Sequence, residues 1–259
     1  MKLNRHIDFI NEMASPRPSK KSYIDDEGRR IFNGDLIIKK NQIKDGKLNI
    51  YPYDIVTGDF ICSNNQLTSL EGGPNEVGRN FACDNNQLTS LEGGPYKVGK
   101  SFWCNANKLT SLEGVPKEVN EIFNCSFNKL TSLEGGPTLV GESFVCSDNK
   151  LTSLEGGPTS VGGSFNCFVN QLTSLEGGPT SVGGYFICTT NQFDLSIEKR
   201  FIKSGNYLNN YWIELFKYML SNKIELIDVK GWPKSFIKTL KPKYKNLLSS
   251  STVINKFNL

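Results

Sequence analysis

Apolar residues recur in this chain at a fixed period of 21 residues. Each copy opens with Phe, any residue and Cys, so the Phe and Cys side chains fall on one face of a short strand. A unit this short cannot bury its own apolar face, so the copies must stack on one another as a solenoid. The repeated pairs are Phe60 and Cys62, Phe81 and Cys83, Phe102 and Cys104, Phe123 and Cys125, Phe144 and Cys146, Phe165 and Cys167, and Phe186 and Cys188.

An asparagine stands three residues after every one of these cysteines, from Asn65 to Asn191. A leucine, or Phe193 in the last copy, follows two residues later. The asparagine lies between apolar positions, which places it inside the coil. A buried amide needs hydrogen-bond partners, and the backbone of the turn and of the next coil offers them. The pattern therefore predicts an asparagine ladder with a structural role.

In five of the seven copies the second half reads Leu-Thr-Ser-Leu-Glu-Gly-Gly-Pro, as in residues 88–95. Proline removes a backbone donor and glycine weakens helices, so we expect an extended or polyproline-like return to the next strand. A unit of 21 residues also leaves little room for a helix.

The order apolar-x-apolar-x-x-Asn-x-Leu-x-x-Leu, as from Phe165 to Leu175, resembles the leucine-rich repeat. The Leu-Thr-Ser-Leu half is similar to a short variant found in bacteria and phages, and the resemblance covers seven consecutive copies. It implies a curved parallel sheet with little convex helix, whose concave face recognises other proteins.

The repeat begins before its most regular part. Residues 34–43 align without gaps with residues 58–67, which predicts a diverged first coil and about eight short strands. The expected fold is thus a β-rich solenoid with a small α-helical C-terminal cap. We place an N-terminal flank or cap at residues 1–33, the solenoid at 34–193 and a basic, mainly helical cap at 194–259.

The seven cysteines form one column of the predicted ladder. Side chains in such a column run parallel and do not converge, whereas zinc needs four ligands around one point. An odd number of cysteines also argues against a disulfide scaffold. We expect buried, reduced cysteines that act as small apolar core residues, with no metal and no cofactor. A reducing compartment, most simply the cytoplasm, fits this usage.

Charge is distributed unevenly. Residues 58–193 carry 7 basic and 13 acidic side chains, whereas residues 194–259 carry 12 and 5. The basic segment invites a nucleic-acid interpretation, since lysines bind phosphates, but no recognisable DNA- or RNA-binding motif accompanies it. Lysines on a cap helix are more simply solvated. The candidate basic contacts are Lys234, Lys238, Lys241, Lys243 and Lys245.

Several classes of protein are disfavoured. Nothing approaches the run of about 20 apolar residues that spans a bilayer, and residues 1–19 lack the apolar stretch of a secretory signal. His6 is the single histidine, so a Ser-His or Cys-His pair depends on it alone. No G-x-x-x-x-G-K-[ST] motif occurs. We expect a soluble protein that is not an enzyme.

Residues between the inward positions of each strand project outward and vary from copy to copy. Apolar side chains among them, such as Trp103 and Tyr185, indicate an interface, although an unconstrained surface varies as well. The predicted partner-binding residues are Ile61, Asp84, Trp103, Asn105, Asn124, Phe127, Val145, Asn166, Phe168, Val169, Tyr185 and Ile187.

The sequence favours a non-catalytic module that binds another protein through the concave face of the solenoid. By analogy with phage and bacterial proteins that carry similar repeats, we expect a phage or bacterial intracellular inhibitor or effector of a host factor. Two alternatives stay open: a nucleic-acid-associated protein acting through the basic C-terminal segment, and a structural or assembly protein. The partner and the oligomeric state are not specified by the sequence.

Overall fold

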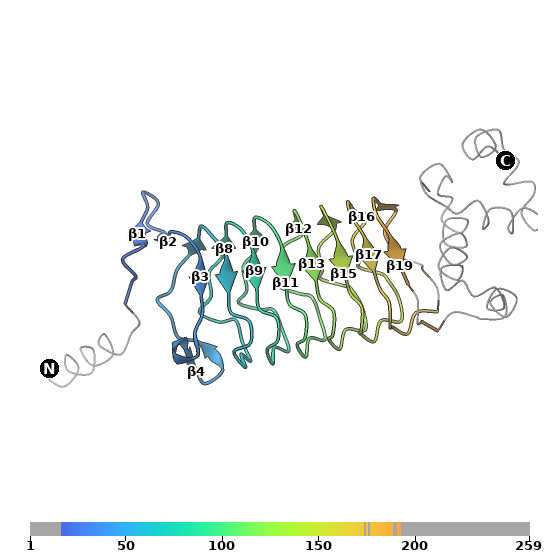
Figure 1. Cartoon of the computed structure of the whole chain (residues 1–259), viewed down its shortest axis with the longest axis horizontal. Coiled ribbons are helices and arrows are strands. Elements are labelled where there is room, and N and C mark those ends of the chain that lie inside the picture. Colours follow the sequence, from blue (N-terminus) through green and yellow to red (C-terminus); the bar gives the residue numbers. More distant parts are fainter. Residues whose placement is uncertain (1–16, 174, 176, 189–190, 193–259) are drawn as a thin grey trace, which may run out of the picture.

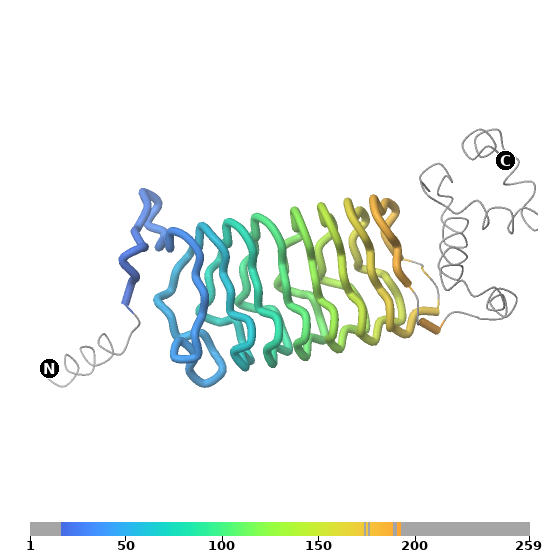
Figure 2. Tube along the Cα trace, viewed as in Figure 1, coloured from blue at the N-terminus to red at the C-terminus, as the bar shows by residue number. Residues whose placement is uncertain are grey.

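A computed structural model describes residues 17–173, 175, 177–188 and 191–192. These residues form a β-solenoid whose coils follow one another in an elongated row (Figures 1 and 2). Each coil contributes one strand to an eight-stranded sheet, here called the front sheet, and its strands are all parallel. In coil order these are β3 (Leu36–Ile37), β7 (Phe60–Ile61), β9 (Phe81–Ala82), β11 (Phe102–Trp103), β13 (Phe123–Asn124), β15 (Phe144–Val145), β17 (Phe165–Asn166) and β19 (Phe186–Ile187).

The eight strands of the front sheet confirm the predicted number, including the diverged first coil. That coil is longer because its extra residues form the 3₁₀ turn η1 (Lys40–Gln42) and the hairpin of β4 (Ile43–Lys44) and β5 (Lys47–Leu48). The hairpin turns at Asp45 and Gly46, whose φ angles are 52° and 75°. An Asp-Gly pair is the sequence that such a left-handed turn favours.

The return segments carry a second row of short strands that the sequence pattern did not predict. Because the copies stack in register, each return meets the backbone of the coil before it; for example, the Gly78 N–H donates to the Val56 carbonyl at 2.8 Å. The strands of this row are β2 (Arg30–Phe32), β6 (Ile55–Val56), β8 (Glu76–Val77), β10 (Lys97–Val98), β12 (Glu118–Val119), β14 (Leu139–Val140), β16 (Ser160–Val161) and β18 (Ser181–Val182). At the N-terminal end of the row, β1 (Ser22–Ile24) pairs antiparallel with β2.

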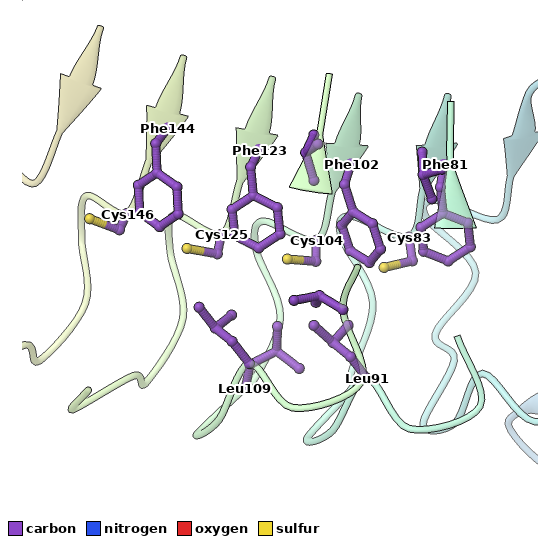
Figure 3. Close-up of a cluster of buried hydrophobic side chains, with 14 of the residues drawn as sticks. Phe81, Cys83, Leu91, Phe102, Cys104, Leu109, Phe123, Cys125, Phe144 and Cys146 are labelled. Atoms are coloured by element: carbon purple, nitrogen blue, oxygen red, sulfur yellow. The ribbon is translucent and has the colours of Figure 1, made fainter. Parts of the chain in front are cut away.

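The core is a set of ladders that run along the stack, and Figure 3 shows the part from Phe81 to Cys146. The seven repeat phenylalanines contact one another in sequence, with neighbouring ring centroids 4.9 to 5.9 Å apart. Cysteine, leucine and valine ladders pack beside them, and all seven cysteines are buried. The prediction of small apolar core cysteines is confirmed. Burial raises the pKa of the six thiols from Cys62 to Cys167, because a thiolate is poorly solvated there.

The asparagine ladder is also confirmed. The Asn107 amide donates to the carbonyls of Cys83 and Cys104 at 3.0 and 3.1 Å, and its Oδ1 accepts from the Leu88 N–H at 3.0 Å. Each amide thus joins its own turn to the coil before it. The same pattern recurs at Asn86, Asn128, Asn149, Asn170 and Asn191.

The row of return strands is interrupted between β10 and β12, which do not pair. From β8 onward, a glycine follows the valine of every return strand except β12, and a Cβ on Gly141 would stand 2.0 Å from the Asn120 carbonyl oxygen. These returns therefore reach pairing distance where the later residue is a glycine. Asn120 has a Cβ, so β12 does not pair with β10, and the Asn120 Nδ2 donates to the Gly99 carbonyl at 3.0 Å instead.

Candidate interaction surface

The outer face of the front sheet is built by residues that alternate with the buried ladder positions. Strand pairing aligns one row of outward residues along the stack, with Trp103 between Ala82 and Asn124. Because parallel strands lie about 4.8 Å apart, neighbours in this row are within contact reach. The aligned row comprises Ile37, Ile61, Ala82, Trp103, Asn124, Val145, Asn166 and Ile187.

Apolar side chains gather over coils 5 to 8, where coil 1 carries β3 and coil 8 carries β19. Phe127 and Tyr185 expose 59% and 74% of their surface, and Ile187 exposes 37%. Phe168 and Val169 are half-buried. We call these five residues the apolar patch. The other apolar residues predicted for the face, Ile61, Trp103 and Val145, are half-buried.

Two residues of the apolar patch adopt a left-handed backbone. The chain turns two residues after each cysteine, and φ there lies between 52° and 60° in the six copies from Asn64 to Val169. Asn and Asp tolerate this conformation best, and a β-branched residue such as valine is a true outlier. Phe127 has φ 53° and Val169 has φ 52°. Their side chains are therefore held at a backbone cost that asparagine at the same position would reduce.

Most polar residues predicted for the face bond to their own chain. Asn124 Oδ1 accepts from the Ser126 N–H at 3.0 Å, and Asn166 Oδ1 accepts from the Phe168 N–H at 3.1 Å. Asp84 accepts from the Ser63 hydroxyl and, at 2.7 Å, from the Asn85 amide. Asn105 is half-buried. These side chains stiffen the strand ends and leave fewer acceptors free for a partner.

Asp148 is a residue of this face that the sequence interpretation did not select. Its backbone is fixed, because its N–H donates to the Phe168 carbonyl at 3.1 Å and its carbonyl accepts from the Asn128 N–H at 3.3 Å. Its Oδ2 is buried and has no hydrogen-bond partner among the described residues. The sequence signal was a carboxylate two residues after a cysteine of the repeat, the position that Phe127 and Val169 hold in their own copies.

A hollow lies on the return row. An open hollow of about 270 Å³ is lined by β12, β14 and β16, next to the break at Asn120. Leu139 lines it and is 44% exposed. The departure of this copy from the repeat was visible in the sequence, but its consequence for the strand pairing was not.

The buried cysteines form one column along the stack. Figure 3 shows the Cys83, Cys104, Cys125 and Cys146 sulfurs in a row, without convergence. Within the described ranges, no group of three or more His, Cys, Asp or Glu side chains is placed to hold a metal ion. The same ranges contain no helix with the length and apolar character to cross a membrane. The predicted C-terminal cap, with Lys234, Lys238, Lys241, Lys243 and Lys245, lies outside the described residues.

Comparison with protein-family models and with curated proteins finds no match to this chain. The repeat and the structure together place it among parallel β-solenoids with a coil of 21 residues.

Proposed function

We propose that this chain is a non-catalytic recognition module of the leucine-rich-repeat type, which binds another protein through the outer face of the front sheet. Its setting would be the cytoplasm, where a phage or bacterial protein of this kind acts as an inhibitor or effector of a host factor. The apolar patch forms the centre of the contact, and the Ser-, Asn- and Asp-rich outer face of coils 2 to 4 forms its polar rim.

The observation that carries this proposal is the left-handed backbone of Phe127 and Val169. A non-glycine residue in this region costs on the order of 1 to 3 kcal/mol, and such strain clusters at functional sites. Folding does not require these side chains, because Asn64 and Asn85 make the same turn. Retention of an exposed phenylalanine at this cost is explained if the side chain contacts a partner.

The composition of the patch supports the same proposal. Exposed Tyr185 and Phe127 offer large, rigid surfaces, and aromatic anchors commonly supply most of the binding energy of an interface. The repeat copies show that smaller polar residues fit the same positions, since Ser164 occupies the position of Tyr185 one coil earlier. The apolar residues are therefore additions to a scaffold that folds without them.

The test uses substitutions that the chain itself already accommodates. In a front variant, Phe127→Asn, Phe168→Ser, Val169→Asn, Tyr185→Ser and Ile187→Asn each introduce the residue of another copy at the same position. A matched return variant, Tyr96→Thr and Leu139→Ser, removes two exposed apolar residues from the return row by the same rule.

Tagged wild type and both variants are used to capture proteins from a lysate of the natural host. The proposal predicts one protein captured by wild type and by the return variant, and lost with the front variant. Circular dichroism confirms that all three are folded. Equal capture by the front variant would refute binding through this face.

A second candidate function is favoured by one observation, the excess of 12 basic over 5 acidic side chains in residues 194–259. We propose nucleic-acid binding there only as the alternative. It predicts that wild type and the front variant both bind a duplex oligonucleotide, with an affinity that falls steeply as salt rises.

A further inference from the structure

The carboxylate of Asp148 is the least satisfied group on the outer face. A buried carboxylate oxygen without a donor is unfavourable, because it loses hydration and gains nothing in return. Asp59 and Asp84, on the same face, do not share this condition. Asp59 accepts from the Asn80 N–H and side-chain amide at 3.0 and 2.9 Å, and Asp84 accepts from Ser63 and Asn85.

The chain does not supply a cation to Asp148 within the part that the structure describes. None of the seven ion pairs found there includes this residue. In coils 2 to 8, no lysine or arginine occupies an outward position of the front strands or of the turn two residues after the cysteine. Lys150, two residues along the chain, is exposed and makes no ion pair with it. Within the described ranges, no side chain supplies a positive charge to this site.

The residues around Asp148 favour a guanidinium over an ammonium group as the cation. Phe127 holds the equivalent position one coil earlier and Val169 one coil later, so each lies about 4.8 Å along the stack. Phe168 is bonded to Asp148 through its carbonyl. A guanidinium group suits such a place, because its flat faces stack on aromatic rings while its edge donates several hydrogen bonds to a carboxylate. An ammonium group is more strongly hydrated and fits it less well.

We propose that the protein partner inserts an arginine side chain at Asp148, between Phe127 and Phe168. This inference rests on the proposed function and adds to it the chemistry of the partner: a basic residue flanked by apolar ones. The acidic balance of the solenoid, with 13 acidic and 7 basic residues in 58–193, favours approach of such a partner.

The first experiment tests the ligand chemistry with defined probes. Full-length ¹⁵N-labelled protein is titrated with N-acetyl-arginine amide and with N-acetyl-citrulline amide, which has the same shape without the charge. We expect saturable amide shifts at Phe127, Asp148 and Val169 with the arginine probe, and none with citrulline. Shifts that are absent, equal for both probes, or unchanged by Asp148→Asn would overturn the inference.

The second experiment separates this inference from the proposed function. Asp148→Asn keeps the fold, since Asn64 and Asn85 occupy the same position, and is compared with Glu142→Gln, a charge change on an exposed residue of the same coil. Loss of a charge-assisted bond should weaken partner capture about 10- to 100-fold for Asp148→Asn only. Unchanged capture by Asp148→Asn, with capture lost by the front variant, would reject the arginine and retain the binding face. Capture retained by the front variant would reject both.

Discussion

Removal of one rung of the asparagine ladder should destabilise the whole stack. Asn128 is 9% exposed; its amide donates to the Cys104 and Cys125 carbonyls at 3.1 and 3.0 Å, and its Oδ1 accepts from the Leu109 N–H at 3.0 Å. Asn128→Ala leaves the buried Leu109 N–H without its acceptor, whereas the Cys104 and Cys125 carbonyls each keep one donor, the amides of Asn107 and Asn149. A buried donor left without a partner costs about 1 to 3 kcal/mol, so we expect a loss of that size in the free energy of unfolding.

The assay combines urea unfolding with amide hydrogen exchange. Against a domain stability of about 5 to 15 kcal/mol, the expected loss shifts the unfolding midpoint substantially. Exchange at the Leu109 amide reports the missing bond locally. Asn128→Asp retains the shape but points an acceptor at two carbonyls, and should be at least as harmful, whereas Lys129→Ala, on the exposed neighbour, should be neutral. A loss below about 1 kcal/mol for both Asn128 variants, with Leu109 still protected, would refute the structural role of the ladder.

Three further predictions follow from the return row, the thiols and one ion pair. Gly162→Ala should lower the unfolding midpoint in urea, because the new Cβ would stand 2.0 Å from the Gly141 carbonyl oxygen. Asn120→Gly should raise this midpoint, because β10 and β12 could then pair. Urea titration of both variants tests the role of these glycines. The cysteines from Cys62 to Cys167 should resist iodoacetamide in the folded protein and react on unfolding, since burial raises their thiol pKa; mass spectrometry counts the labels, and labelling of the folded protein would contradict their burial. Hydrogen bonds from Arg30 lower the pKa of Asp54, so the stability it contributes is present above the unfolded value of about 3.9 and is lost as pH falls through the lower folded value. Between pH 5 and pH 3, Asp54→Asn should therefore lose less stability than wild type, and equal losses would argue against this ion pair.

The front sheet and its ladders could be predicted because the same side chains recur with a fixed spacing. Phe, Cys and Asn at constant offsets determine which side of a strand is inside, and stacking then repeats one solution. The first coil was identified through its alignment with residues 58–67. Its added hairpin also had a sequence signal, the Asp45-Gly46 pair, that the repeat pattern obscured.

The return strands could not be read from local sequence. Pairs such as Glu76 and Val77 stand between Pro and Gly, and two residues are too few to show the alternation of a strand. They pair only because neighbouring copies lie in register. The break at Asn120 has the same origin. In the neighbouring coils, a Cβ at this position would stand 2.0 Å from a carbonyl oxygen of the coil before, and local sequence does not show that close approach.

The candidate surface was predicted in part for similar reasons. Outward positions follow from strand alternation, and Phe127 and Tyr185 are exposed as expected. The internal bonds of Asn124 and Asn166, and the unpaired oxygen of Asp148, depend on side-chain orientation that no spacing rule specifies.

The central claim is that the strained side chains of the outer face are retained for binding, and the double variant Phe127→Asn and Val169→Asn tests it most directly. Its unfolding midpoint in urea and its capture of the host protein are measured on the same preparation. The account predicts that the midpoint rises, because asparagine relieves the left-handed strain, while capture falls at least tenfold. A midpoint that falls, together with unchanged capture, would show that these side chains stabilise the fold and do not bind the partner.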